Sequence, residues 1–201
     1  MSATENTRSK EELSKCIMDT AAQLFSEHGV ESVSMHQIAK SAGVGQGTLY
    51  RRYANKADLC IGLMQDTFDQ MQCTINGYIR ETTERPVQER LRGVIGILLD
   101  FLGEKSKMLG VIHAQFMTES NKDDFYQSPP YLFMHDMLTG LISELPDEDS
   151  AMEIDAPFIA HSYIAILSPH TYRHLVCVKG YSHERIYEQF CSLYIDPLFK
   201  S

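Results

Sequence analysis

Several features that would define a membrane, secreted or metal-bound protein are missing from this sequence of 201 residues. It has no run of about 18 apolar residues, so no membrane-spanning helix is expected. The first dozen residues are polar and mixed in charge, unlike a secretion signal with its apolar stretch. The five cysteines are scattered and never spaced C-x-x-C, which predicts reduced thiols rather than a disulfide scaffold or a zinc site. We therefore expect a cytoplasmic protein that needs no metal or cofactor.

An excess of positive charge, the usual mark of a nucleic-acid-binding protein, is also absent, because the formal net charge is −9. The charge is unevenly spread, however. Residues 1–56 carry seven Lys or Arg against six Asp or Glu, and residues 32–56 carry four basic side chains and no acidic one. A locally basic head on an acidic body is what steering toward phosphates requires, although chance clustering in so short a window is an equal alternative.

Apolar residues recur at three- and four-residue steps along almost the whole chain, which indicates an all-α fold. Gly29 is expected to close the first helix, and Pro169 to kink or split another near residue 168, because proline lacks a backbone N–H. The predicted helices, about nine in number, cover residues 9–28, 35–42, 46–52, 56–83, 87–103, 106–118, 129–145, 156–178 and 183–199.

Two short helices joined by a tight turn lie near the start of the chain. Ser34 and Gln37 form the S-x-x-Q pattern of a capping box at the start of the first, and Gly43 stops it. The lengths of these two helices and the signals that start and stop them are typical of a DNA-binding helix-turn-helix. Gly47, which has no side chain, would let the second helix approach DNA closely. The polar and cationic side chains that face outward from the second helix suit base edges and phosphates, and they are Gln46, Thr48, Tyr50, Arg51 and Arg52.

The segment 34–59, SMHQIAKSAGVGQGTLYRRYANKADL, resembles the N-terminal domain of the TetR family of transcriptional regulators. The family pattern is approximately T/S-x-x-x-I-A-x-x-A-G-V-S-x-G-T-L-Y-x-Y/H-F-x-x-K-x-x-L, and this match is far more specific than a bare helix-turn-helix. The resemblance implies a three-helix DNA-binding domain over residues 1–55 and a larger helical domain for effector binding and dimerisation over residues 56–201. It also implies a bacterial repressor that holds a palindromic operator in double-stranded DNA as a homodimer, and that a small-molecule effector releases.

The resemblance also implies roles for individual residues in and next to the DNA-binding domain. Ser34 would cap the second helix and touch a phosphate, His36 would lie beside the DNA backbone, and Lys56 would clamp a phosphate. The positions that it places on the recognition helix in the major groove are Gln46, Thr48, Tyr50 and Arg51. For Tyr50, packing with a hydroxyl-to-phosphate bond is preferred to base readout, and a role for His36 as a solvated surface residue is equally open.

The sequence departs from the family pattern at three positions. Gly45 stands where serine is usual, which predicts a weaker cap on the recognition helix. Arg52 replaces an aromatic residue or histidine, and Tyr53 replaces phenylalanine. An added arginine could tighten the contact with a phosphate or read a guanine. The operator preference of a relative therefore cannot be transferred to this chain.

The body of the chain is rich in Met, Phe and Tyr, whose side chains adapt to irregular apolar ligands. Core packing is the better explanation for any single one of them, and the family resemblance is the main reason to expect a pocket for a mainly apolar effector. For His113 a hydrogen-bonded core position is preferred to a ligand contact. The candidate pocket residues are Met64, Phe68, Met71, Phe101, His113, Phe116, Met117, Tyr131, Met134 and Tyr163.

The last two predicted helices carry large apolar residues on more than one face, which is more than one core can hide. A second copy of the chain is the expected partner, because the resemblance implies a four-helix interface across a two-fold axis. The candidate interface residues are Phe158, Ile159, Ile166, Ile186, Phe190, Leu193 and Tyr194.

An enzyme is not expected, because the sequence shows no nucleophile–base pairing, phosphate loop or metal triad, and no catalytic residue is predicted. His170 and His174 could hold a metal on one helix face, but no third ligand is marked nearby and no metal site is predicted. The alternatives left open are a DNA-binding regulator controlled by a protein partner or a thiol switch, and an activator.

Overall fold

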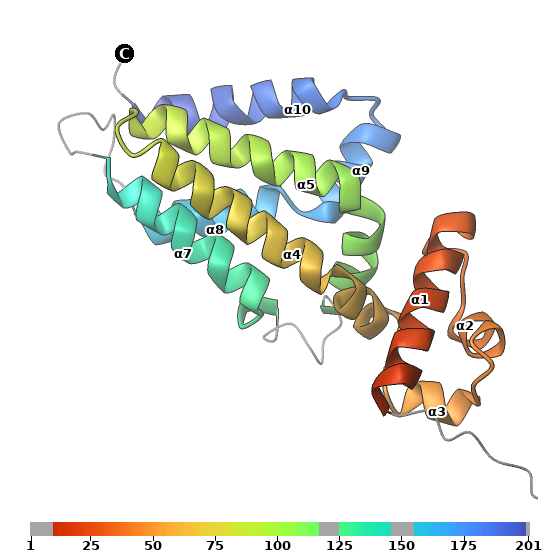
Figure 1. Cartoon of the computed structure of the whole chain (residues 1–201). Coiled ribbons are helices and arrows are strands. Elements are labelled where there is room, and N and C mark those ends of the chain that lie inside the picture. Colours follow the sequence, from red (N-terminus) through yellow and green to blue (C-terminus); the bar gives the residue numbers. More distant parts are fainter. Residues whose placement is uncertain (1–9, 117–124, 146–154, 200–201) are drawn as a thin grey trace, which may run out of the picture. The chain divides into compact units, whose positions relative to one another are not determined.

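The computed structural model describes residues 10–116, 125–145 and 155–199 (Figure 1). These ranges contain nine α-helices and no β-strand, which confirms the predicted all-α class. No helix among them combines the length and the apolar character that crossing a membrane requires. The chain forms two compact units, residues 1–65 and 66–201, which divide inside a single long helix. The functional boundary at residue 55 stays a prediction.

The first unit is a small bundle built around one helix face. Ile17, Ala21 and Phe25 follow one another at four-residue steps along the first helix, and all three are buried. Gly29 ends that helix with a φ of 80°, a left-handed conformation that glycine adopts without steric cost. The helices of this unit are α1 (Lys10–His28), α2 (Met35–Ser41), α3 (Gln46–Tyr50) and the beginning of α4 (Lys56–Glu81).

The second unit is a layered helical bundle with one extended apolar core. Its central helix is the 30-residue α5, which contacts α7, α9 and α10, while α7 packs against α8 (Figure 1). Leu91, Ile95 and Leu99 supply fully buried side chains from α5, and Ile75 supplies one from α4. Besides the end of α4, the helices of this unit are α5 (Val87–Phe116), α7 (Pro129–Ser143), α8 (Ala156–Ile166), α9 (Pro169–Cys177) and α10 (His183–Phe190).

The two helices predicted at 87–103 and 106–118 are one continuous helix, α5, which was not anticipated. The apparent break around Gly103 is a packing requirement instead. A Cβ at this position would meet the hydroxyl of Tyr172 at 3.0 Å, so glycine admits the close approach of α9 without interrupting the helix. The part of the predicted stretch beyond residue 116 lies outside the described residues.

The predicted break near residue 168 is confirmed, since α8 ends at Ile166 and α9 begins at Pro169. Ser168 caps α9 by accepting a hydrogen bond from Thr171 N at 3.3 Å. The last predicted stretch is regular only as far as Phe190. It continues as a π-helical turn over Cys191–Ile195 and a 3-10 turn over Asp196–Leu198.

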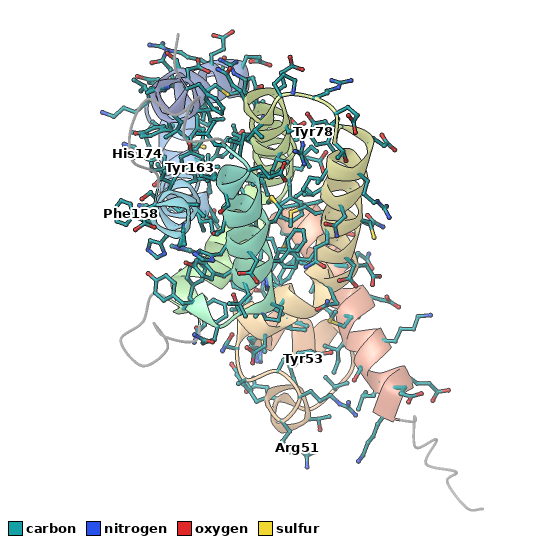
Figure 2. All side chains as sticks on the ribbon, turned by 90° about the vertical axis from the view of Figure 1, so that its left-hand side faces the viewer. Arg51, Tyr53, Tyr78, Phe158, Tyr163 and His174 are labelled. Carbon is teal, nitrogen blue, oxygen red and sulfur yellow. The ribbon has the colours of Figure 1, made fainter. Side chains whose placement is uncertain are left out.

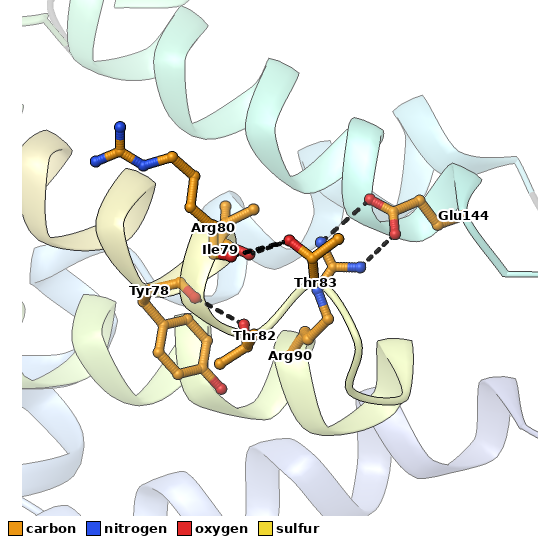
Figure 3. Close-up of polar contacts among 7 residues, drawn as sticks. All are labelled: Tyr78, Ile79, Arg80, Thr82, Thr83, Arg90 and Glu144. Carbon is orange, nitrogen blue, oxygen red and sulfur yellow. Dashed lines mark hydrogen bonds and ion pairs between the residues drawn. The ribbon is translucent and has the colours of Figure 1, made fainter.

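An ion pair with a buried arginine and a half-exposed glutamate joins the beginning of α5 to the end of α7 (Figure 3). The guanidinium of Arg90 donates two hydrogen bonds to the carboxylate of Glu144, and the arginine side chain is 4% exposed whereas the glutamate side chain is 48% exposed. Beside this pair, the Thr82 hydroxyl donates to the carbonyl of Tyr78 at 2.7 Å and closes the last turn of α4. The ion pair therefore links α5 to α7, and the threonine bond closes the end of α4 just before the chain turns into α5.

Candidate nucleic-acid interface

The start of α2 is held by the capping box that the sequence predicts. Gln37 N donates to the Ser34 hydroxyl at 3.3 Å, and Ser34 N donates to the Gln37 side-chain oxygen at 2.8 Å. The flanking apolar residues Val33 and Ile38 are both buried, as expected for a hydrophobic staple. Ser34 therefore has a structural role at the start of α2, and its predicted phosphate contact stays a prediction.

A tight turn separates α2 from α3. Gly43 adopts a φ of 66°, and Val44 N donates back to the carbonyl of Ala39 at 3.0 Å. Ala39 is almost fully buried and Leu49, on α3, is fully buried, so small and apolar side chains seal the contact between the two short helices. This is the helix-turn-helix arrangement that the sequence predicts.

The outer face of α3 is polar, cationic and exposed. Gln46, Gly47 and Arg51 are exposed, and the side chain of Arg51 extends into solvent beside α3 (Figure 2). A Cβ built on Gly47 meets nothing within 4 Å, so the space in front of this backbone is open to an approaching ligand. Tyr50 is 49% exposed, and Thr48 is half-buried. No side chain caps α3 at Gly45, in agreement with the weaker cap predicted there.

The two adjacent arginines are held differently. Arg51 hydrogen-bonds within its own helix, to the carbonyl of Gly47 at 3.2 Å and the hydroxyl of Thr48 at 3.3 Å. Arg52 reaches across to α1 and donates to the hydroxyl of Ser14 at 2.7 Å. A guanidinium carries five N–H donors, so both groups keep donors for DNA. No sequence pattern marked Ser14, because its role depends on the packing of α1 beside α3.

Lys56 is held in a way that the sequence did not reveal. Its ammonium group donates to the carbonyls of Val30 at 2.8 Å, Val33 at 2.9 Å and Glu31 at 3.2 Å. An ammonium has three N–H donors, and these three bonds use all of them. In this geometry Lys56 braces the loop between α1 and α2 and has no donor left for the phosphate that it was predicted to clamp.

Replacing Lys56 by methionine distinguishes the two roles. We expect the thermal midpoint to fall by several degrees, because losing charged hydrogen bonds to the loop costs about 2 kcal/mol. The slope of log affinity for DNA against log salt should stay unchanged, whereas a phosphate clamp would contribute about one unit to it. Thermal melts and salt titrations of the Lys56→Met and Lys40→Met variants provide the measurement and its control. A reduced slope with an unchanged melting temperature would restore the phosphate contact.

The predicted pocket residues fall into separate groups. Met64 is buried in the first unit. In the second unit Met71 and Tyr163 are buried in the main core, and Phe68, Phe101 and Met134 pack against it half-buried. The rings of Phe68 and Phe101 lie 5.5 Å apart. Met117 lies outside the described residues.

The remaining pocket candidates gather around one aromatic side chain, that of Phe125. His113, Phe116 and Tyr131 all place their rings 5.4–6.0 Å from the Phe125 ring. Burial, together with the nearby His170, lowers the pKa of His113, which favours the neutral imidazole. These residues form an aromatic group of their own, and their role as effector contacts stays a prediction.

Only some of the predicted dimer residues offer surface to a partner. Phe158 and Leu193 are 67% and 59% exposed, and Phe158 points outward from α8 (Figure 2). Tyr194 is 39% exposed, and its carbonyl accepts a hydrogen bond from the buried hydroxyl of Tyr163. The other predicted interface residues are less accessible, with Ile186 and Phe190 buried in the core of the protomer and Ile159 and Ile166 half-buried.

The helix-turn-helix is held together by buried apolar contacts and exposes a polar, cationic face on α3. These two features are those of a DNA-binding protein. Comparison with known proteins specifies its class. The family described as "Bacterial regulatory proteins, tetR family" matches residues 17–62. A helix-turn-helix transcriptional regulator of Staphylococcus aureus (strain USA300) is 33% identical over 139 residues, which are 69% of this chain and 72% of the relative. The chain belongs to the TetR family of transcriptional regulators, and the prediction of a regulator rather than an enzyme is confirmed.

The fold extends this similarity over nearly the whole chain. FadR of Thermus thermophilus, a TetR-family repressor solved in complex with lauroyl-CoA, superposes with a TM-score of 0.71 at 14% identity, covering 94% of this chain and 96% of that one. FadR of Bacillus subtilis, solved in complex with stearoyl-CoA, gives a TM-score of 0.63 at 18% identity, covering 91% and 98%. At such low identity these structures show the common fold.

Proposed function

We propose that the protein is a cytoplasmic repressor that binds a palindromic operator as a homodimer and releases it when a small, mainly apolar effector binds. The observation that carries the proposal is the face of α3, where Gln46, Tyr50 and Arg51 are exposed on a helix anchored by the buried Leu49. A dimer would present two such helices to successive major grooves, which lie about 34–36 Å apart along B-DNA. The experiment that tests it is selection of bound sequences from a random DNA pool, which is expected to return a two-fold symmetric site.

A homodimer is supported by two exposed apolar side chains of the second unit, one in the first turn of α8 and one in the π-helical turn after α10. Phe158 and Leu193 keep most of their surface in solvent, which is costly for side chains of this size. Burying them against the same residues of a second copy satisfies both protomers at once, as a two-fold interface does.

Introducing a charge at this surface should separate the protomers. We expect Leu193→Asp to convert a dimer at micromolar concentration into a monomer, because the interface would have to desolvate two carboxylates. Light scattering gives the molar mass directly. Leu132→Asp is the matched control, because Leu132 is an exposed leucine (40%) on α7, and it should leave the dimer intact. A wild-type monomer, or a dimer unaffected by Leu193→Asp, contradicts the assignment.

The effector is proposed to be mainly apolar, and a long acyl chain carried by a polar group is the class tested first. The two FadR structures with the same fold were solved with acyl-CoA molecules. In this chain Phe68, Phe101 and Met134 pack half-buried against the core of the second unit. Their side chains are apolar and can adapt to the shape of a ligand. Effector binding among these helices would change the tilt of α4 and move the two recognition helices out of register with the DNA.

Lauroyl-CoA should therefore weaken operator binding about 5- to 150-fold, the range of ordinary allosteric coupling. Linkage requires the operator to weaken lauroyl-CoA binding by the same factor, which calorimetry measures. Met134→Trp, which crowds the proposed site, should reduce acyl-CoA binding, while the outward Leu132→Trp on the same helix should not. Operator binding that ignores every acyl chain length would reject this effector class, and acyl-CoA binding unaffected by operator would reject the allosteric mechanism.

Control by a thiol switch is less well supported. Burial raises the pKa of the Cys60 thiol to about 11, against a smaller lowering by the Lys56 charge, and burial also raises the pKa of Cys191. Both thiols are therefore protonated and unreactive at neutral pH. Cys73 and Cys177 are exposed and Cys16 is half-buried, so any redox control would have to act through these three thiols.

A further inference from the structure

One contact in the first unit joins two side chains that were each predicted to face DNA. His36 is the second residue of α2 and Gln46 is the first residue of α3, and both are exposed. The side-chain nitrogen of Gln46 lies in hydrogen-bond contact with Nδ1 of His36. The two short helices are thus linked by side chains at the surface as well as by their buried apolar contact.

The chemistry of this contact determines which edge of the glutamine stays available. A glutamine amide has two N–H donors and one carbonyl oxygen, and a neutral histidine with its proton on Nε2 accepts at Nδ1. When Nδ1 accepts the Gln46 N–H that points away from the carbonyl oxygen, the other N–H and that oxygen remain side by side on the free edge of the amide. This donor–acceptor pair matches N7 and N6 of adenine in the major groove.

An isolated glutamine on a helix surface has no such preference. Its side chain samples many rotamers, and its amide can turn over and exchange the positions of oxygen and nitrogen. The contact with His36 limits both freedoms before DNA arrives, which is the form of preorganisation that improves discrimination between bases.

We propose that His36 is a positioning residue for base recognition, holding the Gln46 amide in the orientation that reads an adenine in each operator half-site. The inference rests on the proposed operator binding and assigns the base class that this part of the interface selects. His36 acts through Gln46, so its loss removes discrimination at one base pair rather than affinity for DNA in general.

The experiment uses the full-length protein and an operator obtained by selection from random DNA. Gln46→Ala first identifies the base pair that Gln46 contacts, as the position where base preference disappears. At that position the wild type should prefer adenine by about 5- to 150-fold, the discrimination of a good bidentate pair. His36→Ala should reduce this ratio at least fivefold, while affinity for the other three bases stays within about twofold and the salt slope is unchanged.

Two further variants complete the test. His36→Asn places an acceptor oxygen near the position of Nδ1 and should retain most of the adenine preference. Lys40→Ala, at an exposed position one turn along α2, should leave the preference unchanged. Equal weakening of all four bases by His36→Ala, together with a smaller salt slope, would show that His36 contacts the DNA backbone and would overturn the inference. Preference for a base other than adenine would also overturn it, whereas failure to select any DNA would reject the proposed function itself.

Discussion

Arg51→Ala should weaken operator binding by about one to two orders of magnitude. The Arg51 side chain is exposed at the outer end of α3. Among the described residues its hydrogen bonds are to Gly47 and Thr48 of its own helix, so its charge can meet a phosphate or a guanine edge. Removing it should also lower the salt slope by about one unit if the contact is to phosphate, because one fewer counterion is released. Fluorescence anisotropy of a labelled operator at several salt concentrations measures both quantities.

Arg52 supplies the internal comparison. Its guanidinium already donates to the Ser14 hydroxyl, so Arg52→Ala is expected to weaken DNA binding less than Arg51→Ala and also to loosen the contact between α3 and α1. Ser14→Ala removes only that contact and should leave the salt slope unchanged. Unchanged affinity and slope in the Arg51→Ala, Arg52→Ala double variant would contradict the assignment of this face to DNA.

Glu144→Gln should destabilise the second unit more than Arg90→Met does, although both break the same ion pair. Removing the glutamate charge leaves the guanidinium of Arg90 buried without a counterion, whereas Arg90→Met replaces the buried charge with an apolar side chain of similar length. Glu144 is half-exposed, so solvent screens part of the interaction, and we expect a loss of about 2 kcal/mol for Glu144→Gln. For Arg90→Met we expect less than about 1 kcal/mol.

Urea denaturation of the two variants and the wild type gives the free energies of unfolding. The double variant Arg90→Met, Glu144→Gln should resemble Arg90→Met alone, because the glutamate has no buried charge left to neutralise. The reverse order, with Arg90→Met the more damaging, would show that the pair stabilises the contact between α5 and α7 by more than charge neutralisation.

The sequence predicts most of the helical architecture because its signals are local. The capping box at Ser34, the left-handed glycines 29 and 43 and the proline at 169 each act within a few residues, and each ends or begins a helix where expected. The helix-turn-helix follows from the same signals. Gly103 shows the limit of such reasoning, since a glycine that normally weakens a helix is here required by Tyr172 of α9.

The features of the site that the sequence did not reveal depend on contacts between residues distant in sequence. Lys56 is 23 to 26 positions away from the carbonyls that use its donors, and Arg52 is 38 positions away from Ser14. The same limit applies to the dimer surface. An apolar pattern over residues 183–199 cannot show that Ile186, on α10, faces the protomer's own core while Leu193, within the π-helical turn, faces solvent.

Selection of bound DNA from a random pool, followed by affinity measurement on the selected site, tests the central claim most directly. We expect a palindrome whose half-site centres lie about one helical turn apart, which the dimer binds and the Arg51→Ala variant does not. We also expect the affinity for this site to fall when an apolar effector such as lauroyl-CoA is added. Enrichment of no sequence over the starting pool, or of a site that Arg51→Ala binds equally well, would contradict it.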